Sequence, residues 1–83
     1  MQIKEMKTMF RFSSDIGKII LRGEPGEWRL SVYVGVGQET LDVARGGNRL
    51  FKTLDAAYEV ARELEGIFSD HNERSLPIEI QPD

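Results

Sequence analysis

The clearest pattern in the chain is the alternation of apolar and polar residues from Trp28 to Val36. This period of two is typical of a strand that buries one face and exposes the other. Residues 18–22 precede it with a β-branched, apolar run, and residues 23–26 (Gly-Glu-Pro-Gly) lie between the two as a turn. The sequence therefore predicts a β-hairpin in its first half.

Two further short strands are predicted after this hairpin. Residues 35–38 close the long strand as a hairpin turn, and Leu41 and Val43 alternate in the next strand. Residues 46–48 (Gly-Gly-Asn) supply the positive φ angles of a tight turn, so residues 50–53 are expected to return as the last strand of a meander.

From Leu54 to Phe68 the apolar period becomes helical. Thr53 or Asp55 is suited to cap the free N–H groups at the start of this helix. The expected buried stripe consists of Leu54, Ala57, Tyr58, Ala61, Leu64 and Ile67 or Phe68. Against the sheet this helix is expected to bury Trp28, Leu30, Val32, Leu41, Val43 and Phe51.

Both ends of the chain carry shorter patterns. The helical spacing of Ile3, Met6, Met9 and Phe10 predicts a short amphipathic N-terminal helix, although residues 9–12 alone are also compatible with the start of a strand. At the other end, the next apolar alternation is that of Leu76, Ile78 and Ile80. Pro77 favours an edge position for any strand formed there.

These elements define one α+β domain over residues 1–83. We expect an antiparallel meander of three or four strands, packed on one face by the helix in the C-terminal half. The chain has no cysteine and no N-terminal apolar leader, which favours a cytoplasmic location, and its apolar runs are too short to cross a membrane.

Candidate chemistry is sparse. His71 is the single histidine and follows Ser69 and Asp70 in a polar segment, so neither a metal centre nor a catalytic triad is expected. Residues 35–37 (Gly-Val-Gly) lack the third glycine of a nucleotide-binding loop. We therefore expect a non-enzymatic protein that needs no cofactor.

Charge is divided unevenly, although the net charge is only -3. Residues 1–53 carry nine Lys or Arg and six Asp or Glu, whereas residues 54–83 carry two Arg and eight acids. A solvated surface accounts for such a pattern, and so does a basic sheet face. The candidate nucleic-acid-binding residues on that face and around the glycine turn are Arg29, Tyr33, Arg45, Arg49 and Lys52.

DNA is the leading ligand expected for that face. The alternative is a protein partner, or a second copy in a homodimer, bound at the edge strand that contains Leu76, Ile78 and Ile80.

Two family resemblances bear on these alternatives. The order Trp-x-Leu-x-Val, a glycine turn, then Phe-Lys-Thr-Leu-Asp-Ala-Ala resembles the AP2-like DNA-binding domain at the N-terminus of phage integrases, over residues 27–66. That resemblance implies base contacts by Arg29, Ser31 and Tyr33. The run from Arg45 to Ala57 is also similar to short proteobacterial proteins described as partition-associated or uncharacterised, which implies a small bacterial accessory protein.

Overall fold

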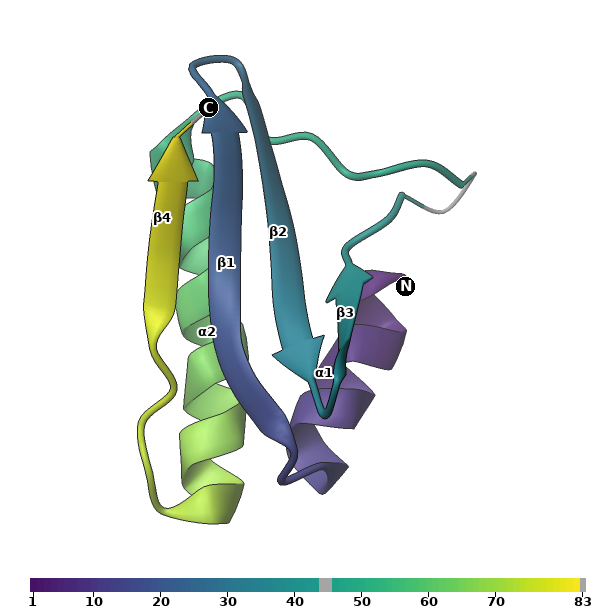
Figure 1. The fold of residues 1–83 in the computed structure, drawn as a ribbon, viewed down its shortest axis with the longest axis vertical. Coiled ribbons are helices and arrows are strands. Elements are labelled where there is room, and N and C mark those ends of the chain that lie inside the picture. The colour runs from purple at the N-terminus through teal and green to yellow at the C-terminus, as the bar shows by residue number, and fades with distance from the viewer. Residues whose placement is uncertain (44–45, 83) are drawn as a thin grey trace.

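The computed structural model describes residues 1–43 and 46–82, which form two helices and four strands. In chain order these are α1 (Ile3–Phe12), β1 (Ile16–Glu24), β2 (Glu27–Val34), β3 (Gly37–Thr40), α2 (Leu54–Asn72) and β4 (Ile78–Pro82). Both helices lie behind the sheet (Figure 1). In the part of the chain that is described, no helix is both long and apolar enough to cross a membrane.

The four strands form one sheet in the order β3-β2-β1-β4. The predicted α+β class is confirmed, and β1, β2 and β3 form the expected antiparallel meander. Strand β4 lies at an edge of the sheet, as predicted from Pro77. However, β4 runs parallel to β1, so the sheet is mixed, and the long helix α2 lies in the connection to β4.

The core lies between the sheet and the two helices. Phe10 of α1 and Phe68 of α2 are both fully buried and meet edge to face, with ring centroids 6.5 Å apart. On the surface, Lys7 Nζ lies 2.7 Å from Glu63 Oε1, so an ion pair also joins the helices. The sequence prediction of an N-terminal helix is confirmed, and the alternative that residues 9–12 begin a strand is wrong.

Helix α2 begins at its predicted residue. The Thr53 hydroxyl accepts a hydrogen bond from the Ala56 N–H at 3.1 Å, which satisfies one of the free donors at the helix start. The helix continues beyond the expected Phe68 and ends where Glu73 adopts a left-handed φ of 54°. The helical period predicts Tyr58 on the buried stripe, but its side chain is 39% exposed because it lines the open cleft beside Leu76 and Ile78.

The third strand differs from the sequence prediction. It consists of Gly37–Thr40 rather than residues 41–43, and residues 50–53 make only an isolated bridge from Phe51 to Trp28. The reason is that the free edge of β2 is shared. Its C-terminal half pairs with β3, and its N-terminal end pairs with Phe51.

The loop after β3 keeps the predicted turn but not the predicted burial. Gly46 and Gly47 have φ angles of 88° and 85°, and Asp42 bridges Asn48 across them. The prediction of a positive φ at Asn48 is wrong, because the two glycines alone supply the positive φ angles of residues 46–48. Val43 was expected in the core, but it is 40% exposed because it lies beyond the end of β3. Trp28, Leu30, Val32, Leu41 and Phe51 are buried as predicted.

We predict that Gly23→Ala destabilises the fold, because Gly23 has a φ of 149° and an added Cβ would lie 2.0 Å from the Glu27 carbonyl oxygen. We expect a loss of about 2 kcal/mol or more in the free energy of unfolding, measured by urea titration. Gly17→Ala is the matched control in the same strand, since its Cβ would meet only Tyr33 Cβ at 3.9 Å. Equal effects of the two substitutions would contradict this account.

Candidate interaction surfaces

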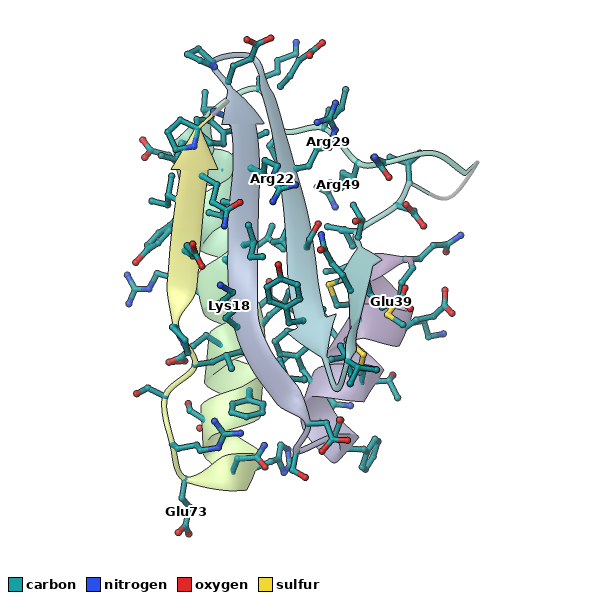
Figure 2. All side chains as sticks on the ribbon, viewed as in Figure 1. Lys18, Arg22, Arg29, Glu39, Arg49 and Glu73 are labelled. Carbon is teal, nitrogen blue, oxygen red and sulfur yellow. The ribbon has the colours of Figure 1, made fainter. Side chains whose placement is uncertain are left out.

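The sheet face opposite the helices is open to solvent (Figure 2). The β1–β2 register sets its side chains in rows, in which Lys18 lies opposite Tyr33 and Arg22 lies opposite Arg29. Lys18 Nζ is 5.1 Å from the centre of the Tyr33 ring, within the range of a cation–π contact. The row between them holds Ile20, which is only 1% exposed although it lies on this face. The aliphatic stems of neighbouring cations are suited to shield it.

The predicted nucleic-acid-binding residues are only partly brought together. Arg29 and Tyr33 lie on the open face of β2. The Arg49 guanidinium lies 4.9 Å from the centre of the Phe51 ring, and Lys52 is exposed beside the β1–β2 turn, where its carbonyl accepts the Gly26 N–H. Arg45 lies outside the described residues.

Carboxylates on the same face oppose these cations. Glu24 and Glu27 pair with each other one row beyond Arg22 and Arg29, and Glu79 of β4 lies beside β1. Sequence reasoning missed this arrangement. Glu27 is in phase with Arg29 along the strand, so its placement could have been inferred, whereas that of Glu79 depends on the parallel pairing of β4. The strands therefore present three cations and three carboxylates on the open face.

A polar network on the open face attaches β4 to β1. Lys18 Nζ donates to Glu79 Oε2 at 2.5 Å, and Arg22 donates from Nε and Nη2 to Gln81 Oε1 at 3.1 and 2.7 Å. Gln81 Nε2 in turn donates to Glu79 Oε1 at 2.9 Å. The Lys18 hydrogen bond, with that of Gln81, lowers the pKa of Glu79 below its ordinary value. The same contact with Glu79 raises the pKa of Lys18.

The outer side of β4 is a free backbone edge. The Ile19 N–H donates to the Pro77 carbonyl at 2.9 Å, and Ile78 is the register partner of Ile19. This hydrogen bond fixes which residues of the parallel ladder face β1. The backbone groups of residues 77, 79 and 81 bond to β1, while the N–H and C=O groups of Ile78 and Ile80 point outward. The backbone N–H and C=O groups of Ile78 and Ile80 are therefore available to pair with a strand of another chain.

A cleft of about 390 Å³ lies between β4 and α2. Its lining residues are Tyr58, Arg62, Glu65, Gly66, Leu76 and Ile78. A Cβ atom added at Gly66 would meet no heavy atom of the described residues within 4 Å outside its own helical segment, so this glycine leaves space in the cleft wall. Sequence reasoning did not single out the α2 residues, because their proximity to β4 follows only from the chain topology.

The three predicted partner-binding residues have different surroundings. Leu76 is only 4% exposed and belongs to the core, so it contributes to the cleft but not to an exposed strand. Ile78 is partly buried against the core, and Ile80 is 44% exposed. The accessible apolar surface of this edge is therefore centred on Ile80 and the cleft, not on Leu76.

The opposite edge of the sheet is different in character. Strand β3 has only four residues, all polar or glycine, and the chain beyond it is engaged by the N-terminus, where the Asp42 N–H donates to the Met1 carbonyl at 2.7 Å. Short, polar and partly covered edges resist further strand pairing. Of the two sheet edges, β4 is the one that combines free backbone groups with apolar side chains.

Within residues 1–43 and 46–82, no group of three His, Asp or Glu side chains is placed to hold a metal ion. His71 is exposed in the last turn of α2. No family model, curated protein or solved structure matches the chain.

We predict that Glu79→Gln weakens the fold in a pH-dependent way. Because the folded-state pKa of Glu79 is lowered, its contribution to stability is complete above its ordinary value of 4.5 and disappears as the pH falls through the folded value. The urea midpoint of the variant should therefore be lower than that of the wild type at neutral pH, and the two midpoints should converge in acid. A difference that is independent of pH would show that the carboxylate charge is not involved.

Proposed function

We propose that this protein is a non-enzymatic binding module that accepts an extended segment of another protein chain as an additional strand beside β4. The observation that carries the proposal is the free edge of Ile78 and Ile80 next to the cleft formed with α2. Strand addition of this kind obtains affinity from main-chain hydrogen bonds and specificity from pockets that receive alternate side chains.

The cleft defines which side chains such a segment would need. Its wall combines apolar surface from Tyr58, Leu76 and Ile78 with the opposite charges of Arg62 and Glu65. Side chains on one face of an added strand would point towards α2, and those on the other face would continue the polar network of Glu79 and Gln81. We therefore expect the bound segment to alternate apolar and polar residues.

Gly66→Leu provides a test that separates binding from folding. The substitution fills the cleft, and it should also raise the free energy of unfolding by up to about 1 kcal/mol because leucine favours helices more than glycine does. We expect random heptapeptides selected from a phage library on the wild-type protein to lose their binding to Gly66→Leu and to Ile80→Lys. Binding is measured by fluorescence anisotropy and stability by urea titration.

Val36→Lys is the matched control, because Val36 is fully exposed in the turn between β2 and β3 and lies away from β4. It should retain binding. In addition, amide exchange at Ile78 and Ile80 should slow when peptide is bound. A library that yields no binder, or binders that are insensitive to Gly66→Leu and Ile80→Lys, would contradict strand addition at β4.

A second candidate function is DNA binding on the open face. One observation favours it: Arg22 and Arg29 lie directly opposite each other, and Arg22 is held by the neutral amide of Gln81 rather than by a carboxylate. Two adjacent guanidinium groups are suited to a phosphate. The carboxylates of Glu24, Glu27 and Glu79 reduce the attraction, so this candidate ranks second.

The DNA candidate predicts that Arg22→Gln together with Arg29→Gln weakens binding to mixed-sequence duplex DNA at low salt. Loss of two phosphate contacts should flatten the dependence of log K on log salt by about 2. Fluorescence anisotropy with labelled duplex gives this slope, and Arg62→Gln on α2 is the control. Wild-type protein that does not bind duplex at low salt would exclude this function.

A further inference from the structure

We infer that the strand added beside β4 is the β4 strand of a second copy of this chain, in a homodimer with a two-fold axis at Ile80. This inference rests on the proposed function, since it names the occupant of the same edge. The two copies would join into one sheet in the order β3-β2-β1-β4 followed by the same strands of the partner in reverse. The evidence is the self-complementarity of β4.

Hydrogen-bond phase is the first part of this evidence. The outward backbone groups belong to alternate residues of β4, and the central one is Ile80. A two-fold axis there makes the two Ile80 residues a hydrogen-bonded antiparallel pair, in which each N–H donates to the other C=O. Each Ile78 N–H can then donate to the Pro82 carbonyl of the other copy. Pro82 lies at the end of the strand, so its missing N–H removes only the outermost bonds.

Charge selects this register over its neighbour. An axis at Glu79 would make the same number of backbone hydrogen bonds, but it would set two Glu79 carboxylates directly opposite each other, which is destabilising. With the axis at Ile80, each Glu79 lies opposite a Gln81. These two side chains already hydrogen-bond within one copy, at 2.9 Å. Thus Glu79 and Gln81, which hydrogen-bond within one copy, are also suited to hydrogen-bond between the two copies.

Burial supplies the third part. Ile80 is 44% exposed on the side of the sheet that faces the helices. In the symmetric register the two Ile80 side chains meet each other on that side and cover each other's apolar surface. Tyr58, which is 39% exposed beside the same margin, would border the contact. The largest exposed apolar side chain of β4 is therefore at the position that the two-fold axis occupies.

A charge exchange at Ile80 tests both the surface and the register. Ile80→Lys and Ile80→Glu each set like charges against each other on the axis, so each variant alone should dimerise at least roughly tenfold more weakly than wild type. When they are mixed, lysine faces glutamate, and a heterodimer should form. Sedimentation equilibrium up to millimolar concentration measures the association, and native mass spectrometry distinguishes heterodimers from homodimers.

The same pair of substitutions at Val36 is the control and should leave wild-type dimerisation unchanged. Circular dichroism establishes that the Ile80 variants are folded. Wild-type protein that stays monomeric at millimolar concentration overturns the homodimer, and so does a dimer that persists in both single variants or a mixture that fails to associate. If the protein is monomeric but selected peptides still require Ile80 and an open cleft at Gly66, strand addition stands and the partner is a different chain.

Discussion

The parallel pairing of β4 with β1 is the constraint on which the rest of the molecule depends. Parallel neighbours cannot be joined by a tight turn, so the chain must travel the length of the sheet between them. Helix α2 provides that passage: its 19 residues span about 28 Å, comparable to the sheet it covers. The same crossover buries Leu64 and Phe68 against the sheet and leaves β4 as the last strand, with a cleft beside it. The buried core and the free edge at β4 thus both follow from the parallel placement of this strand.

The attachment of β4 to β1 is polar on one face and apolar on the other. On the open face, Lys18 and Arg22 bind Glu79 and Gln81, while on the helix side Ile78 packs at the core margin. Exposed ion pairs alone contribute little to stability, so the backbone ladder and Ile78 carry most of this attachment. The polar network has a different consequence. It pairs the charge of Lys18 with that of Glu79, whereas Gln81 holds Arg22 without neutralising it, so the basic surface available to a polyanion is smaller than the sequence suggests.

Local patterns in the sequence predicted most helices and strands correctly, but they could not predict which strands pair with each other. The alternation from Trp28, the helical period from Leu54 and the Thr53 cap each depend on neighbours in sequence, and the structure confirms them. The position of β3 could not be found in this way, because it depends on how β3 and Phe51 divide the edge of β2. The exposure of Val43 follows from that division. Likewise, the crossover through α2 sets the direction of β4 and the neighbours of Glu79. A crossover produces no periodic pattern of apolar residues in the sequence, so neither feature could be predicted.

The two edges of the sheet differ in how well they are protected against strand pairing. A free strand edge favours unwanted association, and proteins usually protect it with short, polar or covered strands. Strand β3 is protected in this manner, whereas β4 keeps Ile80 exposed next to an open cleft. The protective features of β4 are its final proline and the carboxylate of Glu79, and in the dimer that we propose these two features favour one register. An edge with this combination is better suited to pairing with a specific strand than to contact with solvent. In the dimer that we propose, a second β4 strand matches the outward hydrogen-bonding groups, places Gln81 opposite Glu79 and covers the exposed side chain of Ile80.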